Sequence, residues 1–487
     1  MDHRFRQLDS IRYLVSAVFC CLFCALAFAN NPVPQVVGPV KPQAVVPGGA
    51  EFTLTVYGAN FVSGAVVNWN SQARSTTFVS ARELQAQIPS SDIAKPTAGY
   101  ITVTNPPPGG GKSSSSYSIV EVHTPTKTIA VNQPDIYLVK GDPFYVLAAD
   151  ITGNGKLDLI SGVGSGQVAL NRGNGDGTFQ PATTIGKNYF PDAGLAYGDF
   201  DGDGTVDLVY GWGTNIDPPT YLKVLLGKGG GGFRGLPRFD YLSDSFARGI
   251  VAADFDGDGK LDLANGYAGG VPGGWAFHGN GDGTFRRVEN LGMDAGIDMV
   301  GADFNGDGKL DLVGVYGTGI YLFVGNGDGT FQKARRIATD TRYSGCFGQS
   351  MLVNDFDGDG NADLAFCDAN AGRIGILLGN GDGTFQRPVY YSTGYGAGNG
   401  FSFTAGDFNS DGKTDLIAST PAAGGHYNPK FEVLWGNGDG TFQKAKMLAV
   451  PRNGGGEIAL VPGDFNSNGL LDFVMVDASG LEVYIQK

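Results

Sequence analysis

A nine-residue acidic motif, Asp-Phe-Asp-Gly-Asp-Gly-x-x-Asp or a close variant, occurs seven times in this chain and constrains its fold more than any other feature. The copies begin at Asp150, Asp199, Asp254, Asp303, Asp355, Asp407 and Asp464. Consecutive copies start 49, 55, 49, 52, 52 and 57 residues apart. A repeat of about fifty residues predicts stacked or radially arranged units, because one such unit cannot bury its apolar face alone.

Each repeat predicts four strands. A strand such as Gly249–Ala253 leads into the acidic loop, a second begins at Leu261, a third ends in Gly-Asn-Gly-Asp-Gly-Thr-Phe (Gly279–Phe285), and a fourth follows. Asn-Gly and Asp-Gly tolerate the positive φ of tight hairpins, so we interpret this second glycine motif as a turn rather than a metal site. The sequence therefore predicts an all-β fold: a seven-bladed β-propeller, with a linear solenoid as the alternative.

The two ends of the repeat region favour the propeller. The last repeat stops after its third strand, at 481–485, and a spare apolar segment, Thr128–Val131, precedes the first repeat. We predict that this segment supplies the missing fourth strand. Phenylalanines recur in register in the acidic loops (Phe200, Phe255, Phe304, Phe356, Phe408, Phe465) and in the turns (Phe179, Phe285, Phe331, Phe385, Phe442), and we predict that they pack between adjacent blades.

Oxygen-bearing side chains at positions 1, 3, 5 and 9, with a backbone carbonyl at position 7, predict a metal ion in each loop. Glycine at position 6 permits the sharp turn, and an all-oxygen donor set suits Ca2+ rather than Zn2+. The predicted ligand residues are Asp150, Thr152, Asn154, Lys156 and Asp158; Asp199, Asp201, Asp203, Thr205 and Asp207; Asp254, Asp256, Asp258, Lys260 and Asp262; Asp303, Asn305, Asp307, Lys309 and Asp311; Asp355, Asp357, Asp359, Asn361 and Asp363; Asp407, Asn409, Asp411, Lys413 and Asp415; and Asp464, Asn466, Asn468, Leu470 and Asp472.

The number of carboxylates differs between the loops. The loops at Asp199, Asp254 and Asp355 have four carboxylates, and the first and last loops have two, so we expect these two to bind most weakly. The formal net charge is −14, which seven divalent ions would balance. We predict up to seven structural Ca2+ ions, which stabilise the fold and take no part in chemistry.

These repeats resemble the FG-GAP/VCBS repeats found at the head of integrin α chains and in many secreted bacterial proteins. The resemblance rests on the seven acidic loops in register and covers about 360 residues. It implies a seven-bladed propeller with Ca2+ in the loops between the first and second strands. It also implies ligand contacts on the opposite face.

Residues 32–122 differ from the repeats, since they contain no acidic loop and few acidic residues. Alternating apolar and polar residues at 52–57, 84–88 and 101–104 predict short strands of a small β-sandwich. The segment resembles the IPT/TIG immunoglobulin-like family at Pro47-Gly48-Gly49, Gly58–Phe61, Val66–Trp69 and Val103–Pro106. The repeat domain is then expected over 128–487.

Residues 1–29 predict a signal peptide: a basic start, an apolar run over 13–25, and a small-x-small cleavage site at 27–29. An uncleaved membrane anchor is the alternative. We therefore expect export to the medium or the cell surface, with no membrane span after cleavage. Of the five cysteines, only Cys346 and Cys367 would remain, either as one disulfide or as two free thiols.

The functional signals favour binding over catalysis. An acidic chain of pI about 4.7 is unsuited to nucleic acid. None of the four histidines lies in a zinc spacing or a catalytic triad, and no nucleotide-binding motif is present. We predict a non-enzymatic binding or adhesion module for an extracellular glycan or protein. The alternatives are a polysaccharide lyase-like enzyme and a structural envelope protein. The residues predicted around the channel mouth are Asp192, Arg248, Asp298, Gln349, Ser402 and Glu457, and an enzyme would use the carboxylates among them.

Overall fold

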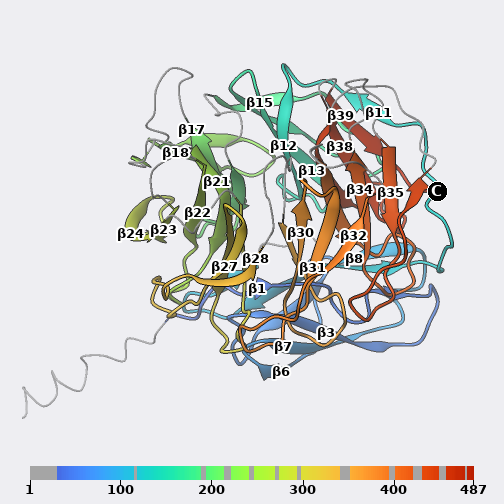
Figure 1. Cartoon of the computed structure of the whole chain (residues 1–487), viewed down its shortest axis with the longest axis horizontal. Helices are drawn as coiled ribbons and strands as arrows, with labels where there is room; N and C mark the ends of the chain where they lie inside the picture. The colour runs from blue at the N-terminus through green and yellow to red at the C-terminus, as the bar shows by residue number, and fades with distance from the viewer. Residues whose placement is uncertain are drawn as a thin grey trace, which may run out of the picture.

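The computed structural model describes residues 30–113, 118–187, 194–212, 221–237, 239–240, 246–268, 274–292, 298–339, 351–393, 401–420, 430–448, 457–477 and 480–487. Their regular secondary structure consists of β-strands, numbered β1 to β39 (Figure 1). Among these residues no helix is long and apolar enough to cross a bilayer.

The N-terminal strands form two facing sheets. One contains β1 (Gln35–Val36), β3 (Phe52–Ala59), β7 (Glu83–Ile88) and β6 (Thr76–Ser80), in that order. The other contains β2 (Ala44–Val45), β10 (Ile119–Val122), β8 (Thr97–Asn105), β4 (Val66–Trp69) and β5 (Gln72–Ala73), with β9 (Gly111–Lys112) paired to β8. The three strand segments predicted from alternation lie in β3, β7 and β8. Inward side chains of both sheets, including Leu54, Leu84 and Trp69, share one buried core.

The acidic repeats form seven antiparallel sheets, whose strands follow one another in sequence order. The first four comprise β12 (Pro143–Ala149), β13 (Asp158–Val163), β14 (Gln167–Asn171) and β15 (Thr183–Lys187); β16 (Leu195–Gly198), β17 (Asp207–Trp212), β18 (Tyr221–Gly227) and β19 (Phe233–Gly235), with β20 (Phe239–Asp240) also on β18; β21 (Phe246–Ala253), β22 (Asp262–Ala268), β23 (Gly274–Gly279) and β24 (Phe285–Gly292); and β25 (Met299–Ala302), β26 (Asp311–Tyr316), β27 (Gly319–Phe323) and β28 (Arg335–Thr339).

The next two sheets comprise β29 (Met351–Asn354), β30 (Asp363–Asp368), β31 (Arg373–Leu377) and β32 (Val389–Ser392); and β33 (Ser402–Gly406), β34 (Asp415–Thr420), β35 (Lys430–Leu434) and β36 (Lys446–Leu448). In every repeat the acidic loop joins the first strand to the second, and position 9 of the loop is the first residue of the second strand.

The seventh sheet joins the two ends of the repeat region. It contains β37 (Glu457–Gly463), β38 (Asp472–Asp477), β39 (Gly480–Tyr484) and, from before the first repeat, β11 (Asp135–Tyr137). An early strand does complete the last repeat, but it is β11 and not the predicted Thr128–Val131. The predicted segment makes only an isolated bridge between Val131 and Gln486, because the register along β39 is already filled by β11.

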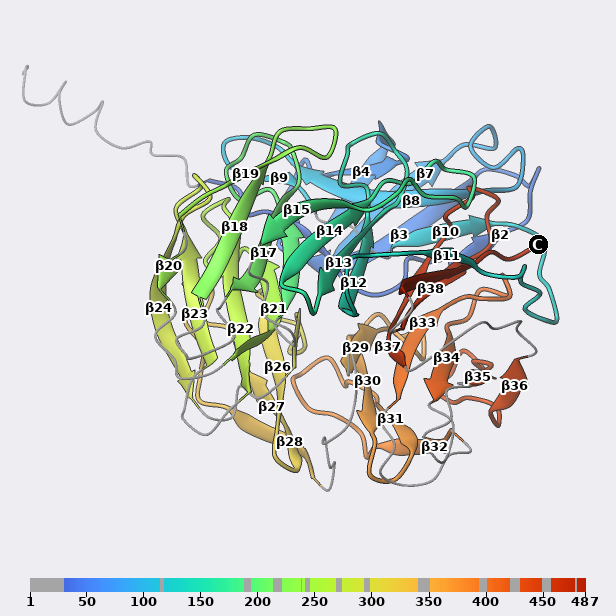
Figure 2. The same cartoon turned by 90° about the horizontal axis from the view of Figure 1, so that it is seen from above.

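Apolar clusters pack each sheet against the next. One cluster combines Leu170 of the first sheet with Tyr210 of the second. Another combines Val461 and Val474 of the last sheet with Val146 of the first. The views in Figures 1 and 2 show the sheets side by side around a central space. The arrangement is all-β and propeller-like.

The recurrent phenylalanines pack between sheets as predicted. The Phe in one acidic loop contacts the turn Phe of the following repeat, with ring centroids 5.4–5.8 Å apart in the pairs Phe200–Phe285, Phe255–Phe331, Phe304–Phe385 and Phe356–Phe442. Phe465 of the last repeat contacts Phe179 of the first at 5.5 Å. The same pairing of a loop Phe with a turn Phe therefore joins the last repeat to the first.

Candidate metal centres

The third loop shows how the sequence shapes each acidic turn. Gly257 and Gly259, at positions 4 and 6, have φ of 75° and 84°, which side-chain-bearing residues rarely adopt. This turn aims both amides back at the first carboxylate: Gly257 donates to Asp254 Oδ1 at 2.7 Å and Gly259 to Asp254 Oδ2 at 2.9 Å. Position 1 is thereby held inside the turn.

The carboxylate at position 9 fastens the loop to the end of the third strand. Asp262 Oδ2 accepts a hydrogen bond from Phe255 N at 3.0 Å, and Oδ1 accepts one from Gly279 N at 2.8 Å. The Oδ1 atoms of the equivalent aspartates accept from Gly173, Gly227, Gly325, Gly379, Gly436 and Gln486. The sequence predicted this residue only as a metal ligand, and the structure gives it a second role in holding the sheet together.

Three loops bring three acidic side chains together with ligand oxygens within 4.8 Å of one another: Asp199, Asp201 and Asp203; Asp254, Asp256 and Asp258; and Asp355, Asp357 and Asp359. In the sixth loop the buried Asp415 Oδ2 atom has no hydrogen-bond partner of normal geometry among the described residues. Such crowded, partly unsatisfied oxygen donors fit a hard divalent cation.

Burial raises the pKa of the position 9 carboxyls, since it disfavours their charged form. It raises the pKa of Asp262 to about 8, with a further increase from Asp256 and Asp254. For the same primary reason the pKa is raised to about 7 in Asp311, about 8 in Asp363 and about 9 in Asp415. Ionising these carboxyls at neutral pH therefore costs free energy in the folded protein, unless a cation neutralises their charge.

These shifts predict that without divalent cations the protein loses stability as the pH rises from about 4 to about 9. An unfolded Asp releases its proton near pH 4, whereas these native carboxyls keep theirs until pH 7–9, so the native state binds more protons throughout that window. Urea unfolding in chelator at about pH 5 and about pH 8 measures the effect. A midpoint that rises between the two values would contradict it.

The N-terminal sandwich lies against the ends of the sheets that carry the acidic loops (Figure 1). Two of its cations pair with position 1 carboxylates: Lys41 Nζ lies 3.1 Å from Asp355 Oδ2, and Arg82 Nε lies 3.1 Å from Asp303 Oδ2. Both carboxylates are almost fully buried, whereas the Lys41 and Arg82 side chains are 31% and 26% exposed. In the fourth and fifth loops the chain thus supplies its own counter-charge.

Three further loops contact the sandwich through hydrogen bonds. Val33 N donates to Asp254 Oδ2 at 2.8 Å, and Tyr100 Oη donates to the Asp464 carbonyl at 2.7 Å. Ser410 Oγ donates to Glu121 Oε2 at 2.5 Å, and both side chains are buried. The sandwich therefore contacts five of the seven loops.

Removing the two interdomain cations should weaken this docking. Each of the variants Lys41→Met and Arg82→Met should cost about 1–2 kcal/mol, less than a fully buried pair, because each cation is partly exposed. Calorimetry of the double variant should show the sandwich unfolding separately from the repeats. Arg74→Met is the control, because Arg74 pairs with Asp92 inside the sandwich at 2.6 Å. Separation in the control but not in the double variant would refute the docking role.

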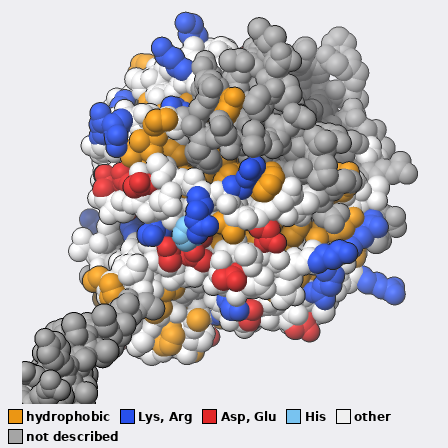
Figure 3. Space-filling view, turned by 90° about the vertical axis from the view of Figure 1, so that its left-hand side faces the viewer, with side chains coloured by type: hydrophobic (Ala, Val, Ile, Leu, Met, Phe, Trp, Pro, Cys, Tyr) orange, Lys and Arg blue, Asp and Glu red, His pale blue; other side chains and the backbone are white. Residues whose placement is uncertain are grey.

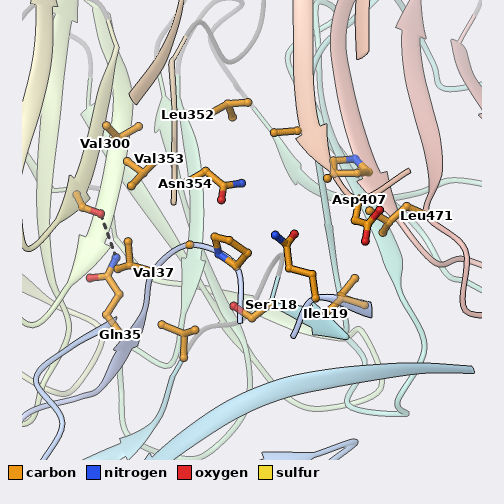
Figure 4. Close-up of a pocket in the computed structure, with 18 of the residues that line it drawn as sticks. Gln35, Val37, Ser118, Ile119, Val300, Leu352, Val353, Asn354, Asp407 and Leu471 are labelled. Carbon is orange, nitrogen blue, oxygen red and sulfur yellow. Dashed lines mark hydrogen bonds between the residues drawn. The ribbon is translucent and has the colours of Figure 1, made fainter. Parts of the chain in front are cut away.

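A cavity of about 330 Å³ lies where the sandwich meets the central space (Figure 4). Gln35, Val37 and Ile119 line it from the sandwich, and Val300, Leu352 and Asp407 are among the residues that line it from the first strands and loops of the sheets. Gln35 Nε2 donates to the Gly301 carbonyl at 3.5 Å. The sandwich thus spans the central space at the end that carries the acidic loops.

The predicted channel-mouth group is only partly described. Asp192 and Gln349, and the side chains of Arg248 and Glu457, lie outside the described residues. Asp298 is half-buried, and its Oδ1 accepts from Met299 N at 3.0 Å. Ser402 is buried, and its Oγ accepts from Leu460 N at 3.1 Å, so it joins two sheets.

One functional candidate was missed in the sequence. His278, treated there as an isolated histidine, lies beside the third loop with Nδ1 2.5 Å from Asp256 Oδ2 and 3.6 Å from Asp262 Oδ1. Alignment of the repeats on their glycine turns would have placed it at the end of a third strand. Cys367 is buried and disulfide-bonded, and Cys346 lies outside the described residues.

Protein-family models match parts of the repeat region. The model described as an FG-GAP-like repeat matches residues 150–210, 303–366 and 355–418, and the FG-GAP repeat model matches 399–442. Cartilage acidic protein 1 of Xenopus tropicalis is 30% identical over 122 residues, which are 24% of this chain and 18% of that protein. The chain thus matches less than a fifth of that relative's length.

Several solved structures are similar in part. An Agrocybe aegerita lectin, described as recognising non-reducing terminal N-acetylglucosamine, is 19% identical with a TM-score of 0.47, covering 79% of this chain and 96% of its own. A Bacteroides ovatus auxiliary nutrient binding protein is 11% identical with a TM-score of 0.40 (93% and 98% covered). A Pseudomonas aeruginosa periplasmic gluconolactonase is 13% identical with a TM-score of 0.44 (73% and 93% covered). Segments of the repeat region therefore match FG-GAP repeat models, and the described sheets form a propeller-like, all-β arrangement.

Proposed function

We propose that this chain is an exported, calcium-stabilised binding protein. Its seven sheets are the blades of a seven-bladed β-propeller of the integrin α type, and its N-terminal sandwich is an IPT/TIG immunoglobulin-like module. The propeller presents the end away from the acidic loops to an extracellular glycan or protein ligand, as an adhesion or capture module. Fold alone does not select this function among the many that propellers perform.

The observation that carries this proposal is the docking of the sandwich on the acidic loops. Because the sandwich contacts five of the seven loops and spans the central space there, a large ligand has access mainly to the opposite end. The sequence places aromatic residues in segments that join strands away from the acidic loops, namely Tyr189, Phe190 and Tyr427, all outside the described residues. Aromatic rings suit the apolar faces of sugars and protein surfaces.

Calcium belongs to this proposal as a structural ion. In each loop the side-chain oxygens at positions 1, 3, 5 and 9 would hold the ion, which would neutralise buried charges that otherwise repel one another. The first and last loops, with two carboxylates each, are expected to bind most weakly. No residue of the loops is assigned a catalytic role.

A binding screen tests the proposal. Residues 30–487 would be applied to immobilised glycans, polysaccharides and extracellular matrix proteins, in about 2 mM Ca2+ and in chelator, with release of sugar ends followed in parallel. We expect saturable, Ca2+-dependent binding without product release. Release of sugar ends, abolished by Asp298→Asn or Glu457→Gln, would instead favour a polysaccharide lyase-like enzyme. Absence of both would leave the structural envelope role.

A further inference from the structure

The residue just before the glycine turn of each third strand differs between repeats. Six repeats have side chains poorly suited to bind a metal ion: Arg172, Leu226, Val324, Leu378, Trp435 and Ile485. The third repeat has His278 in β23. At this position the third repeat alone has a histidine, which lies beside its acidic loop.

The His278 ring faces three carboxylates of its own repeat. Nδ1 lies 2.5 Å from Asp256 Oδ2 and 3.6 Å from Asp262 Oδ1, and Nε2 lies 3.7 Å from Asp258 Oδ2. One ligand atom from each of Asp256, Asp262 and His278 fits within a span of 4.8 Å. A single ion can therefore contact all three side chains after small rotamer adjustments.

The backbone hydrogen bonds around these side chains leave lone pairs available to an ion, and the side chains are partly shielded from water. Asp256 uses Oδ1 to accept from Asp258 N, so its Oδ2 remains for the ring or for an ion. Both oxygens of Asp262 are fixed by backbone amides, which orient the carboxylate and leave lone pairs unused. The His278 and Asp256 side chains are only 16% and 13% exposed. Figure 3 shows a histidine beside clustered acidic and basic side chains on this side of the molecule.

We infer that the third loop is a mixed nitrogen and oxygen site for a first-row transition metal ion of the Zn2+ class, held by His278, Asp256 and Asp262. Ca2+ takes oxygen ligands almost exclusively, whereas imidazole is a preferred ligand of Zn2+, Co2+ and Ni2+. The clusters at Asp199–Asp203 and Asp355–Asp359 contain only carboxylates. The third loop thus differs from them in metal preference. This inference does not depend on the identity of the extracellular ligand.

Two simpler arrangements compete with this site. In one, His278 is only hydrogen-bonded to Asp256; in the other, the third loop holds Ca2+ and the ring lies outside the coordination sphere. The first predicts no saturable transition-metal binding. The second predicts that replacing His278 changes no metal affinity.

Calorimetric titration with Zn2+ tests the inference on residues 30–487 in about 2 mM Ca2+, which fills the all-oxygen loops. We expect one high-affinity Zn2+ per chain, weakened at least about tenfold in His278→Leu and in Asp256→Asn. Co2+ in place of Zn2+ should give visible d–d absorption that His278→Leu removes. Unchanged Zn2+ affinity in His278→Leu, or no saturable binding by the native chain, would overturn the assignment.

The controls separate this site from chance binding and from misfolding. His123→Leu removes the other described histidine, whose Nδ1 contacts the Thr124 carbonyl, and should leave Zn2+ affinity unchanged. Leucine occupies the position of His278 in other repeats, at Leu226 and Leu378, so His278→Leu should fold. His278→Gln provides a second variant that keeps a polar side chain. Loss of Zn2+ binding in His123→Leu alone would place the site elsewhere and overturn the inference.

Discussion

Chelation of divalent cations near neutral pH should lower the melting temperature of this protein by about 5–10 °C. At a dissociation constant of about 10⁻⁴ M and about 1 mM Ca2+, each occupied site contributes RT ln 11, or about 1.4 kcal/mol. Three to five occupied loops then contribute about 4–7 kcal/mol. An unfolding entropy of about 2.1 cal/mol/K per residue over about 360 residues converts this into the stated shift.

The number of loops that bind Ca2+ depends on two ion pairs between the sandwich and the loops. By sequence alone, five loops are rich in carboxylates, but Arg82 and Lys41 already pair with Asp303 and Asp355 in two of them. If Lys41 and Arg82 stay paired with these carboxylates in the presence of Ca2+, a calcium titration should find fewer than five strong sites. The double variant Lys41→Met/Arg82→Met should then gain two strong sites. Scanning calorimetry in excess chelator, with Ca2+ restored as the control, measures the shift. An unchanged melting temperature would show that the loops hold no stabilising ion.

Asp363→Ala should be among the most destabilising single substitutions in the repeat domain, at about 2–6 kcal/mol. Asp363 is fully buried, and its two oxygens accept hydrogen bonds from Phe356 N at 2.8 Å and Gly379 N at 2.7 Å. Alanine leaves both amides buried without an acceptor, at about 1–3 kcal/mol each. It also removes a predicted metal ligand. Urea unfolding with and without Ca2+ separates the two contributions.

Asp382→Ala is the matched control in the same repeat. Asp382 lies exposed in the glycine turn, where it accepts from Thr384 N and Oγ1 at 2.9 and 2.5 Å. Its removal leaves solvent-accessible groups that water can satisfy, so the loss should be much smaller. Equal losses in the two variants would refute the structural role assigned to position 9.

The repeats show how much of the fold local sequence encodes. Glycines with positive φ, such as Gly257 and Gly259, specify the acidic turn within a few residues, and recurrence of the motif specifies equivalent strands. The predicted Phe packing followed because Phe recurs at the same two positions in most of the repeats. The sequence predicted that a strand from before the first repeat completes the last sheet, but it gave the wrong segment. The pairing of Tyr137 with Leu481 depends on residues far apart in sequence.

The sequence by itself determined the all-β class, the seven acidic turns and the oxygen chemistry of the loops, because each depends on residues within one repeat. It also determined the phenylalanine pairs, which join neighbouring repeats, because the same positions recur along the chain. Only the tertiary structure decided what surrounds those loops. It brings Lys41 and Arg82 of the sandwich to Asp355 and Asp303, and His278 to Asp256. Lys41 and Arg82 lie more than 200 residues from their partners, so these contacts depend on how the domains pack. His278 lies 22 residues from Asp256, and their contact depends on the pairing of strands within one sheet.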